Sequence, residues 1–271
     1  MKQNYLKKIF FCFLLISNIS YGQLVTTIDF ENELDGYSPS TTTGSSGSYR
    51  VLFNRANYNL PSVTNQDGYY WAAEDIPSSA PNPYLNLNQI DVSGATAFIF
   101  SIDMTTRHFN DWDDTDELLI TYSIDGGTYQ NLMWIQNTED GSEFNTPAAL
   151  DIDFDGEGDC STENTLPALI TGSSSSGCNV SSSNFKTFTT NSISLTSNST
   201  LDIKLQFNGL TSQAEGIYLD NIMITQSVPS VITWTGSSNS DWATSENWDS
   251  GVPSSSDNVT IPDVTNAPII D

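Results

Sequence analysis

Apolar and polar residues alternate along several short segments of this chain. The alternation is clearest at 201–208, where Leu201, Ile203, Leu205 and Phe207 are separated by single polar residues. Successive side chains of a β-strand point to opposite faces, so this period of two predicts a strand with one face on a core and one in water. No segment shows helical periodicity, which favours an all-β protein.

Further segments that are rich in apolar residues and bounded by turn residues predict a sandwich of two sheets. We expect strands at 25–30, 97–103, 117–124, 128–135 and 217–224. The strands 117–124 and 128–135 should form a hairpin, because Gly126 and Gly127 between them accept the positive φ of a tight turn. Short strands separated by turn residues, over roughly 200 residues, predict a two-sheet β-sandwich of jelly-roll type.

The first 22 residues have the pattern of an export signal. Lys2, Lys7 and Lys8 precede the apolar run 9–16, and small residues follow at 20–22. The run is too short to span a bilayer, and the chain has no second apolar span. We therefore expect a product that is outside the cell or on its outer surface, with no membrane insertion.

Net charge limits the partners of the chain. The chain has 33 acidic and 8 basic residues and a formal charge of −25. Three of the basic residues belong to the export signal, so without it five basic residues remain beside 33 acidic ones and the charge is −28. Such a field repels nucleic acid and anionic membranes and attracts cations. Plain solubility explains part of this charge, but five acids crowd one stretch: Asp111, Asp113, Asp114, Asp116 and Glu117.

The densest run of acids lies at 151–160, with the sequence Asp-Ile-Asp-Phe-Asp-Gly-Glu-Gly-Asp-Cys. Calcium takes six to eight oxygen ligands, and alternate acids let a short loop wrap around one ion. Gly156 permits the sharp bend. The predicted calcium ligands are Asp151, Asp153, Asp155, Glu157 and Asp159. A solvated acidic turn is the alternative interpretation.

This loop departs from the EF-hand, because Thr162 stands where the EF-hand has its bidentate Glu. Its pattern more closely resembles the calcium loops of thrombospondin type 3 repeats. Two cysteines remain after the export signal, Cys160 and Cys178. In an oxidising compartment an even count predicts a disulfide, which would close the Ser-rich segment between them.

We expect the sandwich domain to cover 23–226 and a linker to follow at 227–232. The amino-acid composition changes after this linker. Trp234, Trp242 and Trp248 fall within fifteen residues, followed by a Gly-Val-Pro and an Asp-Asn-Val-Thr-Ile-Pro segment. This pattern resembles the start of adhesin-like β-repeat modules in secreted surface proteins of the type IX secretion class. The resemblance implies that 233–271 begins such a solenoid-like module, and that the chain is a piece of a longer polypeptide or a truncated product.

The region 24–225 resembles the jelly-roll modules at the front of the same class of proteins. The similar segments are Asp29-Phe30-Glu31, 70–76, 122–127, the 151–159 loop and Leu219-Asp220-Asn221-Ile222. In many such modules the first and last strands bring a Glu and an Asp together around a structural calcium. Carried over, the resemblance implies that Glu31 and Asp220 are ligands of a second site; solvated edge carboxylates are the alternative.

Three functions remain open on the sequence. The first is a calcium-stabilised, non-catalytic module that attaches to a cell surface or an extracellular polymer. The second is a carbohydrate-binding module attached to, or part of, a polysaccharide-degrading enzyme. Sugars stack on exposed aromatic rings. The candidate rings are those of Trp71, Trp112 and Trp134, and also of Tyr69 and Tyr70. Trp112 is expected outside the core because acids surround it, whereas core packing is the alternative for any tryptophan.

An enzyme is the third hypothesis. His108 is the single histidine, and no Gly-x-Ser-x-Gly or His-Glu-x-x-His motif is present. A glycosidase needs only two carboxylates about 5–10 Å apart, which 33 acids could supply. We favour a non-catalytic module with calcium as its cofactor and an extracellular polysaccharide or surface partner.

Overall fold

The computed structural model describes residues 22–44, 52–60, 63, 65–77, 82–106, 112–138, 147–151, 153–156, 158–159, 170–171, 180, 184–196, 200–229, 231–254 and 257–269. The expected export signal up to Tyr21, His108, Glu157 and the predicted Cys160–Cys178 disulfide lie outside these residues. The chain divides into two compact units, Gln23–Pro229 and a C-terminal one that contains the described residues from 231 onward.

The larger unit consists of two antiparallel sheets. Sheet A contains β1 (Gly22–Ile28), β3 (Leu52–Ala56), β4 (Tyr70–Glu74), β7 (Ala97–Thr106), β11 (Ile170–Thr171), β12 (Lys186–Thr190), β13 (Ile193–Ser194) and β15 (Ile217–Val228). Sheet B contains β2 (Tyr37–Pro39), β5 (Tyr84–Leu87), β6 (Ile90–Asp91), β8 (Glu117–Ile124), β9 (Gln130–Asn137), β10 (Ala148–Asp151) and β14 (Thr200–Asn208). A single turn of 3-10 helix, η1 (Gln213–Glu215), joins β14 to β15.

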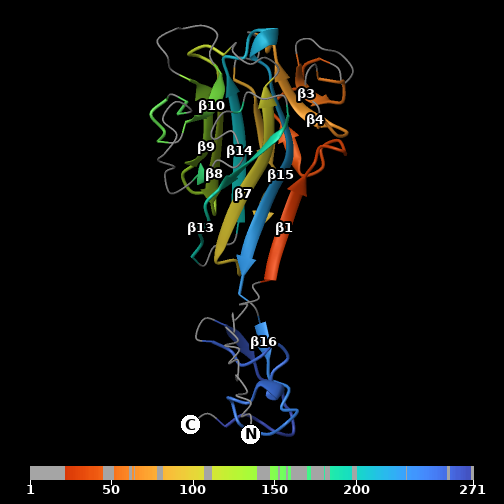
Figure 1. Ribbon diagram of the computed structural model, residues 1–271, viewed down its shortest axis with the longest axis vertical. Coiled ribbons are helices and arrows are strands. Elements are labelled where there is room, and N and C mark those ends of the chain that lie inside the picture. The colour runs from red at the N-terminus through yellow and green to blue at the C-terminus, as the bar shows by residue number, and fades with distance from the viewer. Residues whose placement is uncertain are drawn as a thin grey trace, which may run out of the picture. The chain divides into compact units, whose positions relative to one another are not determined.

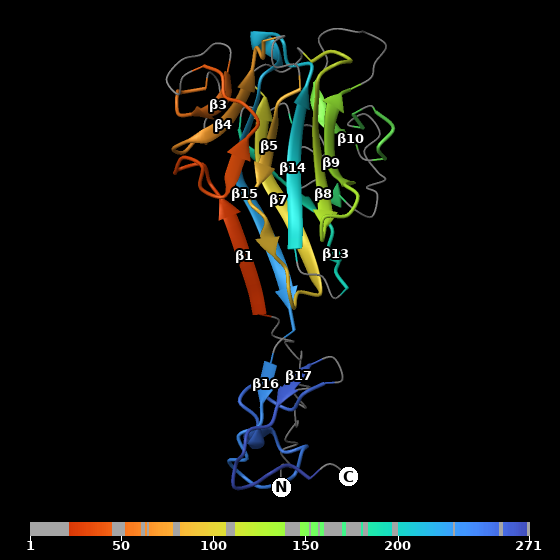
Figure 2. The same cartoon turned by 180° about the vertical axis from the view of Figure 1, so that it is seen from behind.

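Strands distant in sequence are neighbours in both sheets. The main path of sheet A is β11-β12-β7-β15-β4-β3, with β1 also on β15 and β13 also on β7; that of sheet B is β10-β9-β8-β14-β5-β2, with β6 also on β14. Figure 1 views the molecule from the side of β7 and β15, and the view from behind in Figure 2 brings β14 and β5 forward. The unit is therefore an all-β, jelly-roll-like sandwich.

The core lies between the sheets and follows the alternation of the strands. On β14 every second residue from Leu201 to Phe207 is buried, and β7 and β8 repeat the pattern. A smaller apolar cluster covers the outer face of β3 and β4 and includes Leu60, Tyr70 and Tyr218. In the described part of the chain, no helix has the length and hydrophobicity that a membrane crossing requires.

The predicted strands are present, with differences at their ends. The hairpin between β8 and β9 is confirmed, and Asp125 and Gly126 at its turn take φ of 50° and 68°. β1 ends at Ile28 rather than at Phe30, because Phe30 adopts a left-handed φ of 56°. Within the segment 227–232, which we expect to be a linker, β15 continues to Val228 and the next strand begins at Val231, because both find partner strands.

The C-terminal unit is organised by its three tryptophans. β16 (Val231–Thr233) and β17 (Asn258–Thr260) pair in parallel, and η2 (Ser245–Asn247) is a 3-10 turn between them. The Trp248 ring packs edge-on against Trp234 and Trp242, with ring centroids 4.9 and 4.6 Å apart. Each of the two indole N–H groups of Trp234 and Trp248 donates to a backbone carbonyl.

Asn247 holds the loop around this cluster. Its side chain is fully buried; Oδ1 accepts from the backbone N–H of Ser238 and Asn239, and Nδ2 donates to Asn239 Oδ1 and to the carbonyl of Asp241. All hydrogen-bonding capacity of the amide is used, and a buried group that loses its partner costs the full desolvation penalty.

We expect Asn247→Asp to destabilise the C-terminal unit by about 2–4 kcal/mol, because the oxygen that replaces Nδ2 would face two acceptors, Asn239 Oδ1 and the Asp241 carbonyl, with no proton to donate. The measurement is urea unfolding followed by tryptophan fluorescence. Asn258→Asp, at an exposed position of β17, is the matched control and should change little. Equal midpoints for the two variants would contradict the role assigned to Asn247.

Candidate metal sites and binding face

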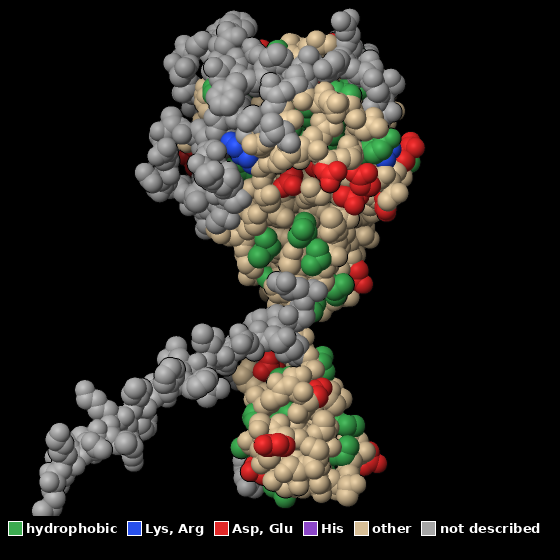
Figure 3. Space-filling view, turned by 45° about the vertical axis from the view of Figure 1, so that its right-hand side comes forward, with side chains coloured by type: hydrophobic (Ala, Val, Ile, Leu, Met, Phe, Trp, Pro, Cys, Tyr) green, Lys and Arg blue, Asp and Glu red, His purple; other side chains and the backbone are tan. Residues whose placement is uncertain are grey.

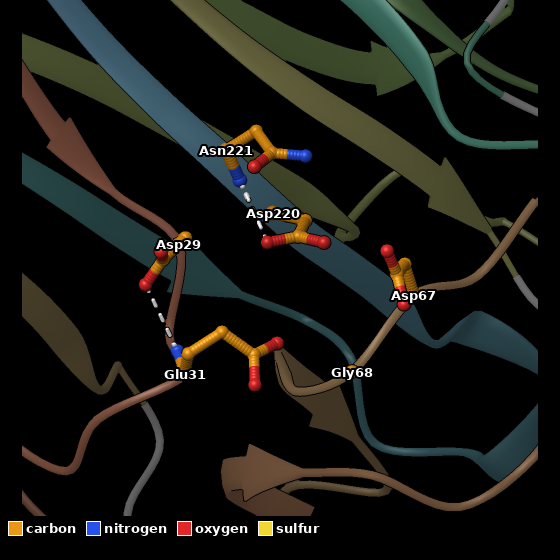
Figure 4. A pocket seen from close by; sticks show the side chains of 6 residues that line it. All are labelled: Asp29, Glu31, Asp67, Gly68, Asp220 and Asn221. Carbon is orange, nitrogen blue, oxygen red and sulfur yellow. Dashed lines mark hydrogen bonds between the residues drawn. The ribbon is translucent and has the colours of Figure 1, made fainter.

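An acidic pocket lies where β15 changes its neighbour in sheet A. β15 pairs with β4 over Ile217–Leu219, and β1 also pairs with β15. β1 ends at Ile28 and β4 begins at Tyr70, so the residues after β1, before β4 and at Asp220 meet in the gap. Six residues line this pocket of about 260 Å3, and Figure 4 shows their arrangement: Asp29, Glu31, Asp67, Gly68, Asp220 and Asn221.

Local backbone irregularities direct the acids of the pocket. Phe30, between Asp29 and Glu31, is left-handed, and so is Asn221, with φ of 45°. The register between β15 and β7 shifts between Asp220 and Met223, which is a β-bulge. Bulges re-aim side chains and are frequent beside functional sites. Here Phe30 lies between the two acids that follow β1, and Asn221 lies within the bulge of β15, directly after Asp220.

Few donors reach the carboxylates of the pocket. Glu31 Oε1 accepts from the Tyr69 N–H at 2.7 Å, Asp29 Oδ1 from the Glu31 N–H at 3.0 Å, and Asp220 Oδ1 from the Asn221 N–H at 2.8 Å. Gly68 has φ of 63°, a conformation that favours glycine, and a Cβ at this position would also lie 1.8 Å from Glu31 Oε1. The turn before β4 therefore lies directly against the Glu31 carboxylate.

The charges of the pocket are unbalanced. Arg55 is close, but its guanidinium donates to the carbonyl oxygens of Phe30 and Glu31 and lies 3.3 Å from the centroid of the Tyr69 ring. In the described chain no basic side chain pairs with the four carboxylates. Acidic side chains gather on the face of the larger unit drawn in Figure 3. Burial raises the pKa of Asp220 to about 7; the hydrogen bond from Asn221 opposes this, and the charges of Asp103, Glu31 and Asp29 add to it.

The loop after β10 forms a second acidic cluster. One carboxylate oxygen from each of Asp151, Asp153 and Asp159 lies within 4.8 Å of the others. Asp151 is fully buried and accepts from the N–H groups of Asp155, at 3.2 Å, and Gly156, at 2.8 Å. Gly156 has φ of 102°, the bend expected from the sequence. Asp155 is not part of the three-carboxylate cluster.

Burial also raises the pKa of Asp151, to about 6. Hydrogen bonds from the backbone of Gly156, Phe154 and Asp155 oppose this shift, and the charge of Asp155 adds to it. The loop is anchored to sheet B, because Gly158 N–H donates to the Asn137 carbonyl and Asp159 N–H to that of Leu150. Three oxygen donors on a fixed frame are a suitable beginning for a hard cation.

Two of the tryptophans predicted as sugar-stacking surfaces are core residues. Trp71 is 1% exposed and packs edge-on against Phe53 and Tyr37. Trp112 is fully buried in the same core although its neighbours in sequence are acidic. The expectation that they present open faces is therefore wrong: β4 is buried on both faces, and acidic neighbours do not determine where an indole points.

Trp134 lies on the outer face of sheet B and is half-buried. The register aligns Tyr84, Gln206, Leu119, Trp134 and Asp151 across five strands. Directly opposed residues of antiparallel strands share a face, so the row runs from the Tyr84 ring to the start of the acidic loop. Trp134 Nε1 donates to Glu117 Oε2 at 2.9 Å, and Lys204 Nζ lies 4.5 Å from the centroid of the Tyr84 ring.

Comparisons with known proteins do not assign a family. No protein-family model matches the chain, and no curated protein matches it. Solved structures match only at low similarity. The K3 cleaved adhesin domain of Lys-gingipain from Porphyromonas gingivalis is 12% identical, with a TM-score of 0.38, over 75% of this chain and 99% of that one.

The xylan-binding module CBM15 is 13% identical, with a TM-score of 0.34, over 77% of this chain and 100% of that one. The enzymatically active domain of tailspike protein 4 from bacteriophage CBA120 is 12% identical, with a TM-score of 0.36, over 73% of this chain; the present chain spans only 20% of that structure's length. At these TM-scores no activity or ligand transfers to this chain.

The structure adds residues to the predicted sites. Glu31 and Asp220 line one pocket, and their role as metal ligands remains a prediction. Asp67 was not anticipated; its only signal is an Asp-Gly turn directly before β4. Asp29 and Asn221 belong to the motifs on the first and last strands, but the sequence did not single them out as site residues.

We expect the metal-free protein to lose stability as pH rises from about 4 to about 7. The carboxyls of Asp151 and Asp220 have raised pKa values in the native state and ordinary ones near 3.9 when unfolded, so the native state binds more protons in this window. The Tm should fall by roughly 5–10 °C. Thermal melts after chelation and desalting test this, and the fall should be smaller in Asp220→Asn. A Tm that rises across the window would contradict the assignment.

Proposed function

We propose that this chain is a secreted, calcium-stabilised, non-catalytic β-sandwich module that attaches to a cell surface or an extracellular polymer. The observation that carries this proposal is the acidic pocket at Asp220, together with the cluster in the 151–159 loop. Both gather carboxylates, those of the pocket have no basic partner among the described residues, and each site includes a buried carboxyl whose pKa is raised. Calcium is a hard cation that binds such all-oxygen sites.

Calcium in these positions would act as a cross-link. In the pocket, Asp29 and Glu31 follow β1, Asp67 precedes β4, and Asp220 lies on β15, so one ion would connect three strands of sheet A. In the loop, Asp151, Asp153 and Asp159 would hold the 151–159 segment against sheet B. Both roles are structural, which suits a rigid module for attachment.

The spacing in the loop is compatible with a shared cation. One carboxylate oxygen from each of Asp151, Asp153 and Asp159 lies within 4.8 Å of the others, so all three can contact one ion at the usual calcium–oxygen distances.

Carbohydrate binding is the second candidate function, and the row across sheet B favours it. Tyr84 and Trp134 are three strand spacings apart, or about 14 Å. Gln206 lies between them, and Asn86 and Lys204 pair in the next row. Aromatic rings and amides on one sheet face are the side chains that hold a neutral sugar chain by stacking and hydrogen bonds.

We expect chelation to lower the Tm of the protein and excess calcium to restore it. At calcium 100-fold above Kd, one site adds about 2.7 kcal/mol to the free energy of unfolding. The stability of Asp220→Asn relative to wild type should change sign with calcium. Without calcium at pH 8 the variant should be more stable, because a buried charge is removed. With calcium it should be less stable, because a ligand is lost. Glu33→Gln, at an exposed position near the pocket, is the control. Melts that are indifferent to calcium would refute the metal proposal.

For the second candidate, we expect Trp134→Ala to weaken binding to a neutral polysaccharide such as xylan or mannan at least tenfold, measured by affinity electrophoresis. Tyr129→Ala removes an exposed ring in the β8–β9 turn and should bind like wild type. Binding that is retained in Trp134→Ala, or absent in wild type across neutral and acidic polysaccharides, leaves surface attachment as the function.

A further inference from the structure

A third group of carboxylates lies at one end of the sandwich, outside both sites described above. Asp113 and Asp116 precede β8, and Glu215 belongs to η1, at the end where β14 finishes in Figure 2. One carboxylate oxygen from each of the three lies within 4.8 Å of the others. Asp116 is fully buried, and Asp113 and Glu215 are half-buried.

Most hydrogen bonds of this group come from nearby backbone. Asp116 Oδ2 accepts from the Asp113 N–H at 2.9 Å, and Asp113 Oδ1 accepts from the N–H and hydroxyl of Thr115. Glu215 Oε2 accepts from the Ser212 N–H at 2.6 Å, as part of the capping box of η1. These bonds position the side chains and leave part of their oxygen capacity unused.

One oxygen has no partner among the residues that the structure describes. Asp116 Oδ1 is buried and accepts no hydrogen bond from them. In the described part of the chain, no basic side chain pairs with Asp113, Asp116 or Glu215. The backbone of Gly209 packs closely against this segment, since a Cβ there would lie 2.6 Å from Asp116 Oδ1 and 2.1 Å from the Thr115 carbonyl oxygen. A buried acceptor without a donor is rare, and a bound ion is one physical explanation for it.

We propose that Asp113, Asp116 and Glu215 bind a divalent cation of the calcium and magnesium class. Three carboxylates with no nitrogen or sulfur among them match the preference of hard cations. The cation satisfies the Oδ1 of Asp116 and balances charges that nothing else in the described chain balances. It also ties η1, and with it the connection from β14 to β15, to the segment before β8.

A proton is the competing occupant. Burial raises the pKa of Asp116 to about 8, opposed by the hydrogen bond from Asp113 and increased by the charges of Glu215 and Asp113.

The test is a count of bound ions on the whole protein. Calcium alone, and magnesium alone in a parallel series, are titrated into metal-free wild type by calorimetry and equilibrium dialysis at pH 7.5. Asp116→Asn keeps the shape of the side chain and should lose one bound ion per chain, or bind it at least tenfold more weakly. Asp114→Asn is the matched control, because Asp114 is exposed in the same segment and its oxygen accepts from Asn137 Nδ2, a role the amide oxygen retains.

Glu215→Gln provides a second variant, since Glu215 is only half-buried and Gln retains an oxygen for the Ser212 N–H. The inference is overturned if both Asp116→Asn and Glu215→Gln keep the wild-type number of ions. Loss of an ion in Asp220→Asn but not in these two would leave the proposed function standing and remove only this site. Unchanged counts in all three variants would remove both.

Discussion

Repulsion between neighbouring carboxylates is the constraint on which this structure depends. For two charges at 4.8 Å, the limit within which the clustered oxygens lie, Coulomb's law gives on the order of 3 kcal/mol at an effective dielectric constant of about 20. A domain of this size has a net stability of roughly 5–15 kcal/mol. Asp116, Asp151 and Asp220 are each buried beside other acids. Protons or cations must therefore compensate them, and a cation converts the repulsion into a link between strands.

The sandwich places these acids where regular pairing stops. Asp151 is the last residue of β10, Asp220 lies at the bulge of β15, and Asp116 directly precedes β8. In the interior of a sheet, the backbone groups are satisfied by the neighbouring strands. At strand ends and bulges, N–H groups are free to donate to a carboxylate, as the Gly156, Asn221 and Asp113 N–H groups do. The fold thus gathers the acids and positions their oxygens, and no basic side chain of the described residues balances the charge of Asp116 or Asp220.

Local patterns were sufficient for the longer strands β1, β7, β8, β9, β14 and β15 and for one of the three clusters, but not for the shorter strands between them. β14 was predictable because one face packs on the core and the other meets water, and the 151–159 loop because its acids are contiguous in sequence. Glu215 and Asp67 could not be predicted, because their partners are set by long-range pairing of β4, β8 and β15. The prediction that the Trp71 ring is exposed failed for a related reason. Trp71 lies on β4, which is buried on both faces, so no alternation of apolar and polar residues shows which way its side chain points.

The register of sheet B connects the proposed calcium loop to the proposed binding face. Asp151 is the cross-strand partner of Trp134, and Gly158 donates to the carbonyl of Asn137 at the end of β9. An ion that orders the loop would therefore also hold the strand that carries Trp134. By thermodynamic reciprocity, a polymer bound on that face would raise the affinity of the loop for calcium by the same factor. Calcium would then stabilise the fold and prepare its binding surface through the same residues.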